Sequence, residues 1–533
     1  MNKLLILPLL AAALGGAALP ETRLTVTLPV DLAADARGRL LVFAEPATAA
    51  NAGADEVDTD AANRNGVAVA ARDVAGFGAD RSVTIDLSQL AYPQNFAAAA
   101  RGDYRVQIVF DRDGDYAYSG RGPGDLVSEV VTVRMPLDSK PAIALTRTVP
   151  PAPDQFDTAG LSPAGAAMVA ASRPHLHEER IASTALTRFR GTPQAVSAWV
   201  LTPPGYDPTS RRTYPTVYTA NGFGSTHRDD GQILAKIWQL METGAIPPMI
   251  WVSPNYATGT GTTEFADSLN NGPWGRALTA DVIPALEARY RMDARPSGRF
   301  LTGHSSGGWF ALWTMVTHPA MFGGSWATAP DPVDFGAFLG ADIYAPGANM
   351  YRDVAGAPRA MERDHDKVLT LTEREARMEA VLGPEGGQLR SFEWVFSPRG
   401  TDGKPLSLFD RETGAVDPAV AAYWRGNYDI GQRIRGAWPK LKADLDGKVH
   451  VRVGTADSFY LDGPVHRLES AFREVGGRAE FQFVPDATHS QRDLYTQSGD
   501  RSAFWKEMTV AMYRIARPES GGRDHRAVRK VRL

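Results

Sequence analysis

Short alternating runs of hydrophobic and polar residues dominate the chain from residue 21 to about residue 145. Residues 24–28, 83–87 and 104–110 alternate or are rich in β-branched side chains, and turn-forming residues separate them. A period of two residues is typical of strands with one buried face. We therefore expect residues 21–145 to form a small all-β sandwich domain.

An acidic run over residues 111–115 (Asp-Arg-Asp-Gly-Asp) separates two of these predicted strands. Such runs can hold calcium, but the EF-hand pattern requires glycine after the third ligand and glutamate at the twelfth position. This chain has Tyr116 and Gly122 at those two positions. The sequence therefore favours a hairpin turn over a calcium loop.

The pattern changes at about residue 181 to short apolar strands that alternate with amphipathic segments. Residues 216–220 and 249–252 look like strands, and one face of a helix lies between them, marked by Ile233 and Ile237. Strand–helix alternation predicts a mostly parallel sheet with helices on both faces. We therefore expect an α/β domain over residues 181–515.

Two segments do not follow this alternation. Residues 146–180 are rich in proline and alanine, which predicts a linker with His175 and His177 as ordinary polar side chains. Residues 331–430 contain many glycines, prolines, charged residues and aromatic side chains. An insertion of this length in a parallel-sheet domain is more typical of a lid or cap than of a free linker. We expect residues 331–430 to form such a lid.

The two ends of the chain are predicted to lie outside the folded domains. A short basic start, apolar residues 4–14 and small residues at 16–18 indicate a cleaved signal peptide over residues 1–18. The apolar run is shorter than the roughly 20 residues that span a bilayer. We therefore expect a periplasmic or secreted protein without stable membrane insertion. The basic segment 516–533 is expected to be a solvated tail.

Composition narrows the chemistry that is open to the protein. The sequence contains no cysteine, which excludes a thiol nucleophile, thiolate metal ligands and iron–sulfur clusters. Its 57 basic and 61 acidic residues give a net charge of −4, so there is no electrostatic footprint for nucleic acid. A length of 533 residues fits about two to four domains. The sequence leaves the oligomeric state open.

A pentapeptide with the pattern of a serine nucleophile, Gly303-His304-Ser305-Ser306-Gly307, follows a predicted short strand and precedes an apolar helix. A nucleophilic serine protrudes from a sharp strand-to-helix turn, and such a turn leaves no room for side chains two positions away on either side. Both of those positions are glycine here. The pentapeptide alone is a weak signal, but the strand before it and the helix after it make Ser305 the predicted nucleophile.

A nucleophilic serine also needs oxyanion donors, a general base and an acid that orients the base. The strand 216–220 ends in a glycine-rich turn, so the backbone N–H groups of Phe223 and Ser306 are predicted to form the oxyanion hole. The base should follow the last strand of the sheet. His489 does so, whereas His466 falls within a predicted helix.

Two carboxylates compete for the acid position. Asp457 lies three residues beyond the glycine that ends a predicted strand, and Asp462 abuts the next helix, where capping of the helix explains it. We favour Asp457 as the partner of His489, and the sequence leaves Asp462 as the alternative. The order serine, aspartate, histidine along the chain is that of the α/β-hydrolases.

Several segments around these residues resemble the putative esterase family. That family includes S-formylglutathione hydrolases, feruloyl and enterochelin esterases, and related mycolyltransferases. The matching segments are Tyr214-Pro-Thr-Val-Tyr218, Asn221-Gly-Phe-Gly224, Trp274-Gly275, Asp281-Val-Ile-Pro284, Tyr290-Arg291 and Gly303-His-Ser-Ser-Gly-Gly308.

The resemblance covers about residues 181–330 and 445–500. It implies an α/β-hydrolase fold and a serine carboxylesterase that needs no metal or other cofactor. A β-sandwich ahead of the hydrolase domain is similar to the arrangement in enterochelin-type esterases. This chain differs at Asn221, where many members carry histidine before the oxyanion glycine, and in its long insertion.

Loops that follow the strands of such a sheet face its active site, which makes some of their residues candidates for substrate binding. These candidates are Glu264 and Trp274, together with Gly224 and His304 beside the predicted oxyanion turn and nucleophile. Helix entry and capping explain Glu264 and Trp274 equally well.

Together these features predict an exported serine ester hydrolase that acts on a small-molecule ester through an acyl-enzyme on Ser305. An acyltransferase would use the same residues. A serine peptidase of the prolyl oligopeptidase type is less favoured, because about 120 N-terminal residues are too few for a propeller. A non-catalytic surface or glycan-binding protein would tolerate a degenerate serine, aspartate and histidine set.

Overall fold

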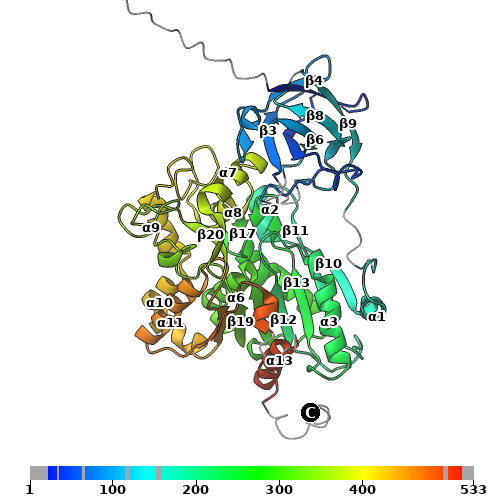
Figure 1. The fold of residues 1–533 in the computed structure, drawn as a ribbon. Helices are drawn as coiled ribbons and strands as arrows, with labels where there is room; N and C mark the ends of the chain where they lie inside the picture. Colours follow the sequence, from blue (N-terminus) through cyan, green and yellow to red (C-terminus); the bar gives the residue numbers. More distant parts are fainter. Residues whose placement is uncertain are drawn as a thin grey trace, which may run out of the picture. The chain divides into compact units, whose positions relative to one another are not determined.

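The computed structural model groups the chain into two compact units that we describe separately (Figure 1). One unit takes residues 1–112 and 124–149, and the other takes 113–123 and 150–533. The predicted signal peptide, residues 115–119 next to the predicted turn at 111–115, and most of the basic tail lie outside the described residues. The described residues are 22–32, 35–62, 66–114, 120–137, 139–151, 156, 158–495 and 502–518.

The N-terminal unit is built from strands, as the alternating pattern predicts. Its buried side chains, such as Val26, Val42 and Ile108, pack into an apolar core of their own. The strands run in the order β4-β1-β9-β7-β6-β2-β3-β5, and β8 pairs with β6. Their bounds are β1 Arg23–Thr27, β2 Gly38–Pro46, β3 Ala68–Val74, β4 Ser82–Asp86, β5 Ala91–Tyr92, β6 Gly102–Asp111, β7 Leu126–Ser128, β8 Val131–Met135 and β9 Ala142–Thr148.

An eight-stranded sheet forms the centre of the second unit, in the order β10-β11-β13-β12-β18-β19-β22-β23. The strands from β13 to β23 pair in parallel, whereas β10 and β11 are antiparallel to their neighbours. This mixed sheet confirms the predicted α/β class. Its strands are β10 Leu176–Ala182, β11 Ala195–Leu201, β12 Thr216–Ala220, β13 Ile250–Pro254, β18 Arg299–His304, β19 Gly324–Thr328, β22 Val449–Gly454 and β23 Glu480–Val484.

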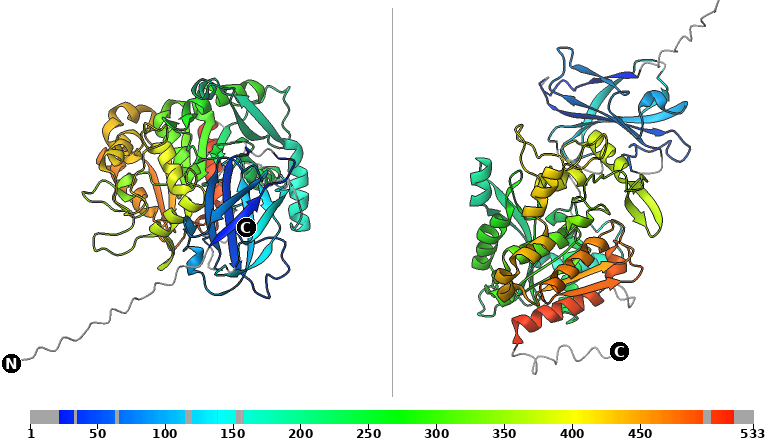
Figure 2. Two further views of the ribbon diagram at one scale, coloured as in Figure 1. Left: turned by 90° about the horizontal axis from the view of Figure 1, so that it is seen from above. Right: turned by 90° about the vertical axis from the view of Figure 1, so that its left-hand side faces the viewer.

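Helices cover both faces of this sheet (Figures 1 and 2). Helix α6 is apolar on every side because it is buried on every side: its residues from Ser306 to Val316 are all buried. Helix α13 packs on the sheet through Trp505, whose ring lies 5.6 Å from that of Trp251. The helices that flank the strands are α2 Thr184–Arg190, α3 Gly231–Glu242, α5 Ile283–Arg289, α6 Ser306–Thr317, α10 Ile430–Leu445, α11 Asp462–Glu474, α12 Gln491–Tyr495 and α13 Ala503–Ala516. Among the described residues, no helix combines the length and the apolar character that crossing a membrane requires.

The predicted linker over residues 146–180 is wrong for most of its length. The strand β9 continues to Thr148, helix α1 occupies Pro163–Ser172, and strand β10 begins at Leu176 as the edge of the large sheet. An edge strand buries little, and only Leu176 and Ile181 of β10 are buried. That sparse apolar pattern made the strand look like a polar linker.

The predicted insertion 331–430 folds as part of the second unit. Most of its aromatic residues are buried: the Phe335 and Trp424 rings lie 5.2 Å apart, and the Phe396 ring lies 4.9 Å from that of Trp309 in α6. Removing the segment would therefore expose the core around α6. Its elements are β20 Ala360–Asp364, β21 Lys367–Leu371, α7 Thr372–Leu382, α8 Gln388–Phe396 and α9 Pro418–Asn427.

Candidate active site

Ser305 lies at a sharp turn between β18, which ends at His304, and α6, which begins at Ser306. Its backbone has φ 57° and ψ −124°, a left-handed conformation that L-residues rarely adopt. A Cβ on Gly303 would lie 2.1 Å from the carbonyl oxygen of Gly307, and one on Gly307 would lie 2.0 Å from that of Ala220. Only glycine fits at either position, which is the reason for the spacing in the pentapeptide.

The structure brings His489 and Asp457 to this serine. His489 Nε2 lies 3.1 Å from Ser305 Oγ, and His489 Nδ1 lies 2.9 Å from Asp457 Oδ2. The second carboxylate oxygen of Asp457 accepts the backbone N–H groups of Phe459 and Leu461 at 2.9 and 3.2 Å. Burial alone would lower the pKa of His489, but the hydrogen bond and charge of Asp457 outweigh burial, and the pKa is raised.

Asp462, the alternative acid, is turned to a different partner. It is the first residue of α11, its carboxylate lies 3.6 Å from the Arg363 guanidinium, and Leu461 occupies the N-cap. The prediction that Asp462 caps this helix is therefore wrong, because the N-cap is the preceding residue. Of the two candidate acids, Asp457 is the one that contacts His489.

The predicted oxyanion turn passes beside the nucleophile. A Cβ placed on Gly222 would lie 3.2 Å from Ser305 Cβ, so the backbone is in close contact with the serine side chain. The Tyr256 hydroxyl anchors the turn by donating to the carbonyl oxygens of Asn221 and Gly222, the latter at 3.2 Å. Phe223 is half-buried in this turn, whereas Gly224 is exposed with φ +77°.

Residues 191–429 match the family model described as "Putative esterase". This match covers somewhat less than half of the chain. Together with the serine at the elbow, it identifies the protein as a carboxylic ester hydrolase, as the sequence predicts.

Solved structures of related enzymes resemble the esterase at low identity. A ferulic acid esterase from Anaeromyces mucronatus is 16% identical over 63% of this chain and 89% of its own, with a TM-score of 0.35. An S-formylglutathione hydrolase from Agrobacterium tumefaciens is 16% identical over 64% and 95%, with a TM-score of 0.37. Dipeptidyl peptidase 4 from Porphyromonas gingivalis is 12% identical over 84% and 46%, with a TM-score of 0.37. No curated protein matches the chain significantly in sequence.

The side chain of Asn221 joins the oxyanion turn of the esterase to the loop that carries His489. Its amide nitrogen donates to Asp230, and its amide oxygen accepts from Gln491 at 3.2 Å. Asp230 is only 2% exposed and also accepts a hydrogen bond from Ser253. Burial raises the pKa of Asp230 to about 7, because two neutral donors only partly replace the lost hydration.

This buried carboxyl should make the stability of the esterase depend on pH. Asp230 ionises near pH 4 in the unfolded chain and near pH 7 in the folded one, so stability falls as pH rises through that window. Between pH 5 and pH 8 the loss should be about 3 kcal/mol, and Asp230→Asn, which has the same shape but cannot ionise, should remove it. Differential scanning calorimetry at the two pH values measures the difference.

The matched control for this experiment is Asp229→Asn, which removes the adjacent, exposed carboxylate. Asp229 caps the turn at Thr226, so its loss should lower the melting temperature by a similar amount at both pH values. If Asp230→Asn melts with the same pH dependence as the wild type, Asp230 is not the titrating group.

Three of the predicted substrate-binding residues are packed inside the esterase. Trp274 is 8% exposed and donates to the Asn271 carbonyl at 3.1 Å, and Glu264 has no exposed surface at all. Burial of Glu264 and Trp274 agrees with the alternative reading, in which they pack within the domain, and their role in substrate binding stays a prediction. The ring of His304 packs 4.7 Å from that of His489, and burial followed by the proximity of His489 lowers the pKa of His304 well below its usual value.

Asp331 contacts the nucleophile but was not predicted as a site residue. The hydroxyl of Ser305 lies 3.2 Å from Asp331 Oδ1, and Ser306 Oγ donates to Asp331 Oδ2 at 2.6 Å. Asp331 comes three residues after strand β19, the neighbour of β18 in the sheet. The carboxyl ends of neighbouring parallel strands meet at one edge of the sheet. A carboxylate just after β19 could therefore have been predicted to lie near Ser305, which follows β18.

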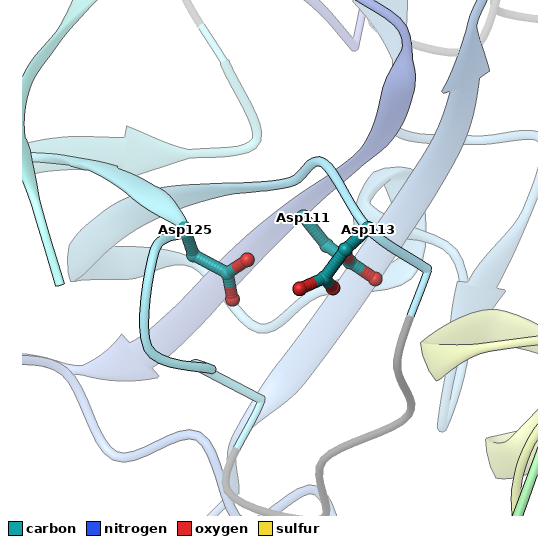
Figure 3. Close-up of side chains that lie close together, drawn as sticks. All are labelled: Asp111, Asp113 and Asp125. Carbon is teal, nitrogen blue, oxygen red and sulfur yellow. The ribbon is translucent and has the colours of Figure 1, made fainter. Parts of the chain in front are cut away.

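One group of carboxylates in the described part of the chain could hold a cation. Ligand oxygens of Asp111, Asp113 and Asp125 lie within 4.8 Å of one another (Figure 3). Asp113 is exposed and Asp125 is buried. Acidic residues often cluster without an ion, and no other feature of the cluster indicates a ligand. It therefore does not change the preference for a turn at 111–115.

Proposed function

We propose that the protein is an exported serine esterase that forms an acyl-enzyme on Ser305. The observation that carries the proposal is the unbroken contact from Ser305 Oγ through His489 to Asp457, at 3.1 and 2.9 Å, in a chain with an esterase-family domain. A non-catalytic binding protein would have no need to retain these three side chains in contact.

In the first half of the reaction, Ser305 Oγ attacks the ester carbonyl while His489 Nε2 takes its proton. Asp457 holds the proton on Nδ1 and stabilises the imidazolium that forms. The backbone N–H groups of Phe223 and Ser306 bind the oxyanion, and the close approach of Gly222 to Ser305 supports this role. The tetrahedral intermediate then expels the alcohol, which receives the proton from His489.

In the second half, His489 activates a water molecule, which attacks the acyl carbonyl. The new tetrahedral intermediate collapses, the carboxylic acid leaves, and Ser305 Oγ recovers its proton from His489. None of these steps requires a metal or another cofactor, which agrees with the activity of the family.

We also propose an α/β-hydrolase fold with a β-sandwich before it and a lid over residues 331–430. A contact of the segment 331–430 with the acid loop supports the lid. The backbone N–H of Arg363 donates to the Ser458 carbonyl at 2.9 Å, and its guanidinium donates to the Asp457 carbonyl at 3.0 Å. The hairpin β20–β21 therefore borders the loop that holds the acid. Export rests on the signal sequence over residues 1–18.

An acyltransferase is the second candidate, because the acyl-enzyme can pass its acyl group to an alcohol in place of water. Adding glycerol to a p-nitrophenyl butyrate assay distinguishes the two activities. A hydrolase is expected to release mainly butyrate at all glycerol concentrations. Glycerol ester as the main product at millimolar glycerol would instead identify a transferase.

A further inference from the structure

The carboxyl group of Asp331 lies against the oxygen that reacts in the proposed function. Asp331 is 2% exposed and bridges both serines of the elbow, with Oδ1 at 3.2 Å from Ser305 Oγ and Oδ2 at 2.6 Å from Ser306 Oγ. Its backbone N–H donates to the Ser305 carbonyl at 3.1 Å. These three hydrogen-bond contacts with Ser305 and Ser306 hold the Asp331 carboxyl beside the nucleophilic oxygen.

Counting protons shows which form of Asp331 fits these contacts. The Ser305 hydroxyl has one proton, and two possible acceptors lie at nearly equal distances: His489 Nε2 at 3.1 Å and Asp331 Oδ1 at 3.2 Å. When His489 is neutral with its proton on Nδ1 toward Asp457, Nε2 must accept from Ser305. Both contacts of Ser305 are then satisfied only if Asp331 is protonated and donates to Oγ.

The surroundings of Asp331 favour this neutral form. Glu264 lies beside it without exposed surface, and Tyr256, His489 and Asp457 are the other titratable groups that face it. Burial, with a smaller effect of the Asp457 charge, raises the pKa of Asp331, although the two serines and His489 act against the shift. Burial, with the charge of Asp331 and a hydrogen bond between the two carboxyls, also raises the pKa of Glu264 well above its usual value. Two adjacent buried carboxyls cannot both ionise easily, and the contacts of Ser305 require a proton on Asp331.

We propose that Asp331 is a further catalytic residue, which in its neutral form donates a hydrogen bond to Ser305 Oγ. This proposal rests on the proposed function of Ser305. During acylation the donated hydrogen bond leaves the serine's own proton for His489. During deacylation the bond between the acyl carbon and Oγ breaks, and Asp331 stabilises the negative charge that develops on Oγ. The carboxyl retains its proton throughout, so the proton balance of the reaction is unchanged.

Two variants test this proposal in the full-length protein with p-nitrophenyl acetate. Asp331→Ala removes the donor, and kcat should fall by about 10–10²-fold with little change in KM, as for other donors to a reacting oxygen. Asp331→Asn retains a donor of the same shape and should keep kcat within about tenfold of the wild type at pH 7. In the wild type, kcat should decline as pH rises through the raised pKa of Asp331 and the neutral carboxyl is lost, and this decline should be absent in Asp331→Asn.

A matched control is Asp429→Asn, which changes another carboxyl that is 2% exposed and whose partners Phe335, Tyr344 and Gln432 do not include the reacting serine or His489. The decline of kcat with rising pH should persist in that variant. Wild-type kcat in Asp331→Ala, or an Asp331→Asn variant as slow as Asp331→Ala, would overturn the donor role. An active Ser305→Ala variant would instead overturn the proposed function itself.

Discussion

Ser305→Ala is expected to reduce kcat for p-nitrophenyl ester hydrolysis by about 10⁴–10⁶-fold. The variant lacks the oxygen that forms the acyl-enzyme, whereas the oxyanion turn and the substrate contacts remain. The fold should persist, because the alanine side chain occupies less space than serine in the same backbone. Steady-state kinetics of purified protein, with circular dichroism of the same samples, measure both effects.

Ser325→Ala provides the matched control for this substitution. Ser325 lies on β19, next to the strand that carries the elbow, and it is also fully buried. Removal of its hydroxyl should leave kcat close to that of the wild type. Retention of more than a few per cent of wild-type kcat in Ser305→Ala, after contaminating esterases have been excluded, would contradict a nucleophilic role.

Asp457→Asn should have the second largest effect, a decrease in kcat of about 10⁴-fold. The amide can offer a hydrogen to Nδ1 and so favour the wrong tautomer of His489, and it cannot stabilise the imidazolium. The Asp457 carboxylate also raises the pKa of His489, so its loss should move the acidic limb of kcat/KM to lower pH. The residual activity must be followed over a pH range to show this shift.

Asp462→Asn distinguishes the two acids that the sequence left open. Its carboxylate lies 3.6 Å from the Arg363 guanidinium, so the variant should lose that ion pair and retain most of the activity. If Asp462→Asn were the more damaging of the two substitutions, the acid in the catalytic chain would be wrongly assigned.

Local chemistry explains why the elbow and its partners were predictable from the sequence. A Cβ at position 303 or 307 would lie 2.0–2.1 Å from a backbone oxygen, so only glycine fits there. The turn around the nucleophile can therefore be recognised in the sequence. His489 and Asp457 follow consecutive strands of a parallel sheet, which fixes the end of the sheet at which they meet. The sequence favours Asp457 over Asp462 as the acid, but only the contact of Asp457 with His489 in the structure decides between the two.

Other parts of the molecule depend on packing that the sequence does not display. Strand β10 was predicted as linker because an edge strand needs few apolar residues. Glu264 was predicted as a candidate for substrate binding because its loop follows a strand of the sheet, and in the structure it is fully buried beside Asp331. Asp331 and Asp230 were not predicted, since their partners are 9 to 26 residues away in sequence and lie on different strands and loops.

Labelling with a fluorophosphonate probe tests the central claim most directly, because the reagent reacts with activated serines. Peptide mapping by mass spectrometry should find one adduct, on the peptide that contains Ser305, and no adduct in Ser305→Ala. Labelling should also be slowed strongly in His489→Ala, since the histidine activates the serine. Efficient ester hydrolysis without an adduct on Ser305, or with the adduct on another residue, would contradict the acyl-enzyme mechanism.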